Sequence, residues 1–251
     1  MAKQRGIMKL EGTIGDITFL KTRDGYLAKE KTHISADRIA NDPAFRRTRE
    51  NGAEFGRAGK SGKLLRNAFR ASIQSVSDSK VVGRLVKSLM AVIKTDTTSD
   101  RGLRNIMAGN QNLLLGFEFN VNAKLSTTLY APYTFSIDRV TGAVSVDMAS
   151  FVPANMIAAP GGTTHFKLRA EVAAVDFTQE SSESDMAETA LLPWDQTATA
   201  VINLQNNLPA NSTGPIILVV GIEFSQEVNG NQYPLNNGAF NALAVVAVDA
   251  V

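Results

Sequence analysis

The pattern of apolar and polar positions divides the chain into two parts. From about residue 42 to about residue 110 the apolar residues recur every three or four positions, and from Phe117 onward they alternate in short runs separated by turn residues. The first spacing is that of one helix face, and the second is typical of an antiparallel sandwich. The pattern therefore predicts an α+β protein, with a hairpin-plus-helical region at 1–112 and a β-sandwich domain at 113–251.

The first elements expected are two short strands around a tight turn. Residues 17–22 and 26–31 are β-prone runs that flank Arg23-Asp24-Gly25, and Asp-Gly supplies the positive φ angles of a hairpin turn. Residues 6–13 are a candidate third strand. A sheet this small buries little apolar area by itself. We therefore expect it to pack against another element or another subunit.

Helices are expected after the hairpin. Asp42-Pro43 has the residue types of an N-cap and a first helical position, so a helix should begin there. Apolar residues at helical spacing predict a further helix over 79–94, and a short one is expected over 100–107.

Four glycines interrupt the segment between these helices, and each costs about 1 kcal/mol in a helix interior. They are Gly52, Gly56, Gly59 and Gly62. The segment is either one helix, with three of the glycines on a face that a neighbouring element can approach closely, or two helices broken near 59–62.

The second part of the chain predicts about eight strands. Two turn pairs, Thr141-Gly142 and Asn229-Gly230, mark hairpins, and the almost wholly apolar run 216–222 is typical of a central strand covered on both faces. These spacings suit an Ig-like or related Greek-key sandwich, without the Cys, Trp, Cys arrangement of antibody domains. The expected strands are 117–122, 134–139, 143–147, 164–177, 186–192, 197–204, 215–228 and 240–251.

Charge follows the same division. The net charge of +2 conceals 22 Lys plus Arg against 11 Asp plus Glu in residues 1–110, and 4 against 13 in residues 111–251. The first part is therefore +11 and basic, and the second is −9 and acidic. A basic region attracts nucleic acid, an anionic surface or the acidic region of another copy of the chain.

The sequence lacks the residue types that several kinds of catalytic and metal-binding site require. The chain has no cysteine and only two histidines, His33 and His165, so no thiolate nucleophile, disulfide framework or histidine-rich metal centre is expected. Gly59-Lys60-Ser61 resembles the end of a phosphate-binding loop, but Glu54 stands where that loop needs glycine. We expect no enzyme, no cofactor and no metal site.

The apolar runs are too short to span a bilayer, and no apolar stretch of signal-peptide length follows the basic N-terminus. We therefore expect no membrane insertion and no secretory signal, and a location in the cytoplasm or within an assembled particle.

Several segments carry a resemblance to uncharacterised proteins of Bacteroidota bacteria. Residues 10–19, 24–26, 41–45 and 47–60 are similar to those proteins, and the similarity continues through residues 130–133 and 227–230, so it covers most of the chain. That family has no known function, so the resemblance implies a bacterial source and assigns no catalytic or binding residue.

Together these features favour a self-assembling structural subunit, in a phage-like or cellular filament, tube or shell. Copies would associate head to tail, the basic half of one against the acidic sandwich of the next. The alternative is a nucleic-acid-binding protein that uses the basic half. The expected contact residues are three apolar hairpin positions and five basic positions: Ile17, Phe19, Leu27, Arg46, Arg47, Arg49, Arg57 and Lys60.

Overall fold

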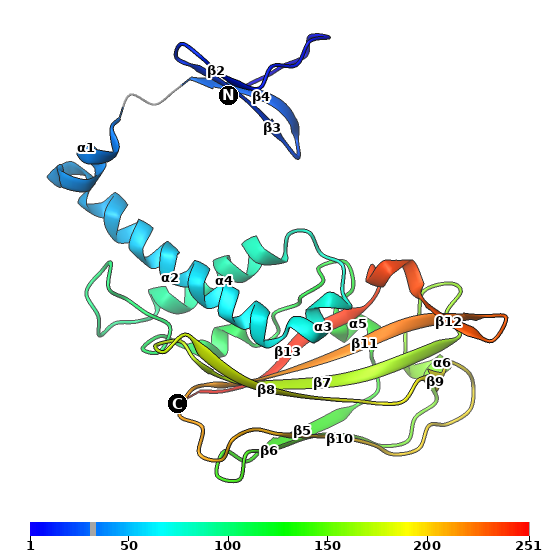
Figure 1. Cartoon of the computed structure of the whole chain (residues 1–251). Coiled ribbons are helices and arrows are strands. Elements are labelled where there is room, and N and C mark those ends of the chain that lie inside the picture. The colour runs from blue at the N-terminus through cyan, green and yellow to red at the C-terminus, as the bar shows by residue number, and fades with distance from the viewer. Residues whose placement is uncertain (31–33, 251) are drawn as a thin grey trace. The chain divides into compact units, whose positions relative to one another are not determined.

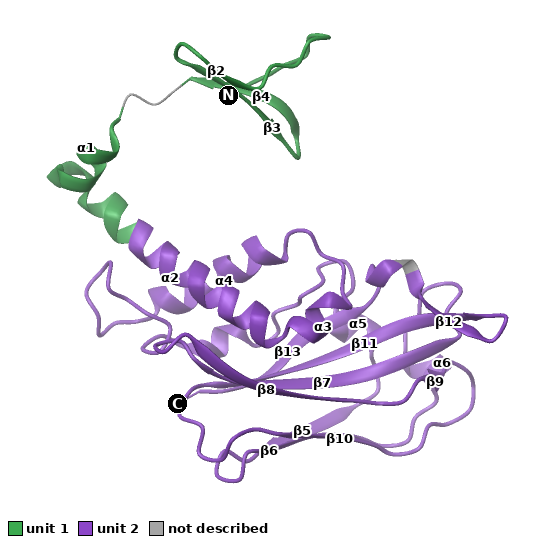
Figure 2. Cartoon of the chain, in the orientation of Figure 1, with its two compact units in different colours: residues 1–51 green, residues 52–251 purple. Residues whose placement is uncertain are grey.

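The computed structural model describes residues 1–30 and 34–250 (Figure 1). These residues form two compact units, Met1–Asn51 and Gly52–Val251, coloured separately in Figure 2. The expected α+β class and the β-sandwich are confirmed.

Unit Met1–Asn51 contains a four-stranded antiparallel sheet, the N-terminal sheet, in the order β1-β4-β3-β2. Its strands are β1 (Ala2–Lys3), β2 (Gly12–Ile14), β3 (Ile17–Thr22) and β4 (Gly25–Glu30). The expected hairpin is confirmed as β3 and β4, with Gly25 at φ +107° in the turn. The expected second strand ended at Lys31, which lies outside the described residues, as does His33.

Helices follow where Asp42-Pro43 predicts them. Helix α1 (Ala36–Asn41) precedes the 3₁₀ turn η1 (Pro43–Phe45), and the Asp42 side chain caps η1 by accepting a hydrogen bond from the backbone N–H of Ala44 at 2.9 Å. Helix α2 (Arg46–Ala68) begins directly afterwards.

Helix α2 passes through all four glycines without a break, so the segment is one helix. Packing compensates for the glycines, because Ala58, Leu65 and Ala68 on its inner face are buried. Only Gly62 lies close to a neighbour: a Cβ there would stand 3.4 Å from Leu89 in α4 (Val81–Lys94). A Cβ on any of the other three glycines would meet no described atom within 4 Å, so the expected close approach along that face is absent from the described chain.

Two expected elements are wrong. Residues 100–107 form turns and not a helix. The backbone N–H of Asn105, which a helix would pair with the carbonyl of Arg101, donates to the buried Asp96 instead, and Glu54 holds the N–H of Gly102. Residues 117–122 form a single bridge beside the last strand, from Glu118 to Ala244, and no strand of their own.

Two antiparallel sheets form the sandwich. The large sheet contains β12 (Asn231–Pro234), β11 (Ile216–Val228), β7 (His165–Asp176) and β8 (Ser181–Glu188), with β13 (Ala242–Asp249) on β11 and β9 (Leu192–Pro193) on β7. The small sheet has the order β10 (Ile202–Asn207), β6 (Ala143–Met148), β5 (Tyr133–Ile137). The short helices are α3 (Arg70–Gln74), η2 (Gln111–Leu114), α5 (Leu125–Thr128), α6 (Pro153–Met156) and η3 (Leu235–Gly238).

The large sheet is covered on both faces, so unit Gly52–Val251 has three layers (Figure 1). Alternate residues of the central strand β7 point in opposite directions: Val172 packs between the two sheets, whereas Ala173 and Val175 pack against the helices. Helix α4 and the part of α2 from Gly52 onward therefore share a core with the sheet and belong to the same unit. The change of charge and periodicity near residue 112 lies inside that unit.

Candidate assembly surfaces

The apolar residues of the N-terminal sheet lie on two different faces. Paired residues of an antiparallel ladder point to the same side, and the register pairs Ile14 with Ile17 in one ladder and Leu20 with Leu27 in the next. Ile17 and Phe19 are two residues apart on β3 and share the face of Ile14, whereas Leu20 points to the other side. The structure therefore brings Ile17 and Phe19 together and separates Leu27 from both.

The N-terminal sheet has no interior of its own. None of the described residues of unit Met1–Asn51 is buried. Ile14 is 65% exposed and Ile17 is 46% exposed, and both lie on the face that also carries Phe19. We call Ile14, Ile17 and Phe19 the apolar face of the N-terminal sheet.

Three of the expected basic contact residues have partners close by in the sequence. Arg46 and Arg47 both bind the Glu50 carboxylate, at 2.9 and 3.2 Å. Arg49 donates to the backbone carbonyls of Ile39 and Asp42, at 2.8 and 2.9 Å. These arginines stabilise the start of α2 and its connection to α1.

The other two expected basic residues hold α2 to segments distant in the sequence. Arg57 donates to the carbonyls of Gly102 and Arg104, at 2.5 and 2.7 Å, and Lys60 binds Glu180 in the β7–β8 turn at 3.1 Å. Both residues line a groove of about 320 Å³. All five basic candidates therefore have partners within the chain, and part of the attraction between basic and acidic halves is intramolecular.

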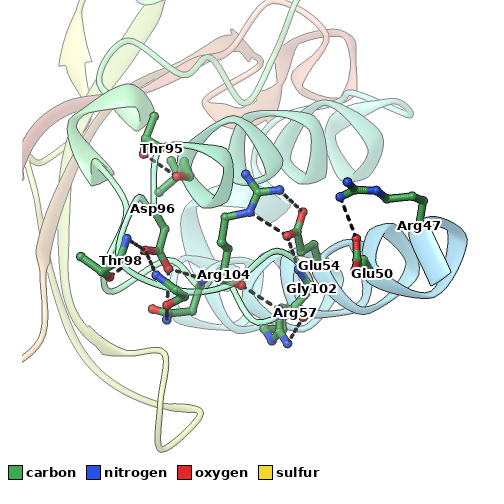
Figure 3. A network of polar contacts seen from close by, with 12 residues as sticks. Arg47, Glu50, Glu54, Arg57, Thr95, Asp96, Thr98, Gly102 and Arg104 are labelled. Carbon is green, nitrogen blue, oxygen red and sulfur yellow. Dashed lines mark hydrogen bonds and ion pairs between the residues drawn. The ribbon is translucent and has the colours of Figure 1, made fainter.

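A buried carboxylate anchors the loop that Arg57 contacts (Figure 3). Glu54 is 1% exposed and accepts hydrogen bonds from the backbone N–H of Gly102 at 2.8 Å and from Arg104 at 2.8 and 3.2 Å. Burial acts to raise the pKa of Glu54, but these donors outweigh it and hold the pKa below its ordinary value. Glu54, Ala58 and Leu65 follow one another at helical spacing, so Glu54 lies on the inner face of α2. That spacing can be seen in the sequence alone.

Asp96 organises the same loop from the end of α4. One of its oxygens accepts from the backbone N–H groups of Thr98 and Ser99, and the other accepts from that of Asn105 (Figure 3). Burial alone would raise the pKa of Asp96, but the donors hold it well below its ordinary value. The run Asp96-Thr97-Thr98-Ser99 has the residue types of such a turn, so the sequence carries a local signal for it.

A third buried carboxylate lies on the helical face of the large sheet. Glu171 on β7 is 4% exposed, and one of its oxygens accepts from the backbone N–H of Ser72 in α3 at 3.3 Å. Burial raises the pKa of Glu171, and the hydrogen bond from Ser72 and the charge of Arg169 only partly offset that effect. Arg169 itself binds Glu188 and Glu223, at 3.0 and 2.8 Å.

The remaining sequence motifs do not form ligand sites in the described part of the chain. Gly59-Lys60-Ser61 lies within the continuous helix α2, so its backbone N–H groups are not arranged as a phosphate-binding loop. Over residues 1–30 and 34–250, no three acidic or histidine side chains cluster closely enough to hold a metal ion. No described helix has the length and apolarity needed to cross a membrane.

Comparisons with known proteins found no relative of this chain. The chain matches no protein-family model, no curated protein sequence and no solved structure. The resemblance to uncharacterised Bacteroidota proteins therefore stays a prediction.

Proposed function

We propose that this protein is a structural subunit that assembles with other copies of itself through its N-terminal sheet. One observation carries the proposal: the described residues of unit Met1–Asn51 include none that is buried, although one face carries Ile14, Ile17 and Phe19. Folding such a sheet alone removes little apolar surface from water, and covering that face with a partner removes more.

The charge distribution supports a second copy as that partner. Residues 1–51 contain 11 Lys plus Arg against 7 Asp plus Glu, a net charge of +4, whereas residues 113–251 contain 4 against 13, a net charge of −9. Contact between the sheet of one copy and the sandwich of the next joins two different surfaces. Such contacts close into a ring or continue as a filament or tube, according to the rotation between copies.

The test measures the mass of the full-length protein by light scattering, from low to high micromolar concentration. We expect species larger than a monomer, formed more slowly at high salt because screening weakens electrostatic attraction between copies. Ile14→Lys should lower the mass at a given concentration, since it places a charge on the apolar face.

Thr13→Lys is the matched control, because Thr13 is the neighbouring residue of β2 and points to the opposite side. It should assemble like the unaltered protein. A full-length protein that stays monomeric at high micromolar concentration in low salt contradicts the proposal. The alternative, nucleic-acid binding by the basic helices, would then be tested by titrating labelled single- and double-stranded DNA.

A further inference from the structure

The sandwich is closed along one side and open along the other. At the closed side the small sheet meets the large sheet, where the backbone N–H of Asn207 in β10 donates to Asp185 in β8 at 2.7 Å. At the other side, no described strand pairs with the outer edge of β5. Residues 116–119 follow β13 only as far as Val245. Free strand edges of both sheets therefore lie at the open side.

Side chains at the open side lack a cover. Phe135 on β5 is paired with the buried Val146 and so faces the interior of the sandwich, yet it is 45% exposed. Leu115 is 57% exposed and lines the same groove, whose volume is about 390 Å³. We call it the β5–β13 groove, because residues 246–249 of β13 also line it. A large apolar side chain that faces inward and is still exposed marks a surface that another chain segment can cover.

We infer that the β5–β13 groove is the acceptor for the N-terminal sheet of a second copy. This inference rests on the proposed function and names the site on the neighbouring subunit. The apolar face of the sheet packs against Phe135 and Leu115, and the free edge of β5 offers unpaired backbone groups to an added strand. The charges of the two parts, +4 for residues 1–51 and −9 for residues 113–251, favour the same pairing.

Cross-linking tests the contact directly, because the chain has no cysteine and single cysteines can be placed freely. Full-length Ile17→Cys and Phe135→Cys are prepared with different tags, mixed and treated with a short bismaleimide. We expect a product that contains one chain of each kind. Ser136→Cys replaces Phe135→Cys in the control, because Ser136 faces away from the groove and its hydroxyl lies 3.0 Å from that of Ser145. The control should give at least a tenfold lower yield.

A second measurement separates this inference from the proposed function. Phe135→Glu should abolish the larger species seen by light scattering, and Ser136→Glu should not. Thermal unfolding of both variants checks that each remains folded. If Ile14→Lys prevents assembly while folded Phe135→Glu does not, the acceptor lies elsewhere and the inference is wrong, although the proposed function stands.

Two further outcomes also overturn the inference. If the unaltered protein is monomeric, it fails together with the proposed function. If a dilute double variant, Ile17→Cys and Phe135→Cys in one chain, cross-links only within itself, the sheet covers the groove of its own chain and not that of a second copy.

Discussion

At the scale of single residues, three buried carboxylates show how hydrogen-bond donors oppose the rise in pKa that burial causes. Glu54 and Asp96 each accept at least three hydrogen bonds, and these hold both pKa values below their ordinary range. Glu171 accepts one long hydrogen bond from a backbone N–H, at 3.3 Å, and its burial raises its pKa. Three carboxylates that are all at most 4% exposed thus have pKa values shifted in opposite directions.

Replacing Glu54 should destabilise unit Gly52–Val251. Glu54→Ala leaves the Gly102 N–H and the Arg104 guanidinium without their acceptor, and removing one member of such a buried pair costs about 3 kcal/mol. Urea unfolding followed by circular dichroism measures the loss. Glu180→Ala is the control, because the Lys60–Glu180 pair is exposed and an exposed pair is worth about 0–1 kcal/mol. Equal losses for the two variants would show that the Glu54 network does not hold the loop.

Glu171 should make stability depend on pH. Its pKa is higher in the folded chain than the ordinary value near 4.3, so the folded state binds its proton more tightly. Stability from this group is therefore complete below about pH 4 and falls as the pH rises to the folded pKa. Glu171→Gln has no carboxyl proton to lose, so its free energy of unfolding should not fall in this way. The difference in free energy of unfolding between the variant and the unaltered protein should therefore move in favour of the variant as the pH rises. Urea unfolding between pH 4 and pH 8 measures the difference, and a difference that does not change with pH contradicts the prediction.

At the scale of elements, α2 keeps three glycines that no packing in the described chain requires. A Cβ on Gly52, Gly56 or Gly59 would meet no described atom within 4 Å. Glycine leaves the unfolded chain more freedom than alanine does, so these positions weaken the helix. The buried face of α2 and the contacts of Arg57 and Lys60 with distant segments offset the helix stability that these glycines lose.

Gly59→Ala should therefore stabilise the protein by about 0.5–1 kcal/mol, the difference in helix propensity. Gly109→Ala is the contrasting variant, because its Cβ would overlap the carbonyl oxygen of Val92 and would force the backbone to move. It should lower the melting temperature while Gly59→Ala raises it. A destabilised Gly59→Ala would reveal a close neighbour that the described structure does not contain.

At the scale of the whole molecule, the helical layer completes the core of the large sheet. The face that it covers consists of Ala173, Val175, Ile217, Val219, Leu243 and Val245, all buried beneath the helices. Without the helices this apolar face is exposed to water. The two cores of unit Gly52–Val251 therefore depend on each other through one sheet.

A fragment of residues 52–251 should unfold in urea in one cooperative transition, because it keeps all three layers. A fragment of residues 113–251, the sandwich expected from the change of pattern, should bind a hydrophobic dye and unfold without a sharp transition. Circular dichroism and dye fluorescence of both fragments measure this. Cooperative unfolding of 113–251 would show instead that the sandwich is a domain in its own right.

Local sequence signals were sufficient for elements whose structure depends on neighbouring residues. Asp24-Gly25 placed the β3–β4 turn, Asp42-Pro43 placed the cap before α2, and alternation located most strands of the sandwich. Local signals failed at residues 100–107, where Asp96 accepts the backbone N–H of Asn105 and Glu54, 48 residues earlier in the chain, accepts that of Gly102. They also could not choose between one helix and two across the glycines, because the packing of Leu65 against other elements decides that question.

The sequence by itself determined the α+β class, the N-terminal hairpin and the separation of charge, because each depends on residue type and short spacing alone. The tertiary structure decided which residues share a surface. Only the strand register separates Leu27 from Ile17 and Phe19, and only the packing of distant segments directs Arg57 and Lys60 to partners in their own chain. Likewise, Phe135 becomes an exposed inward-facing residue only because the small sheet ends at β5. Contacts between residues far apart in the chain are set by the whole fold, and no local pattern records them.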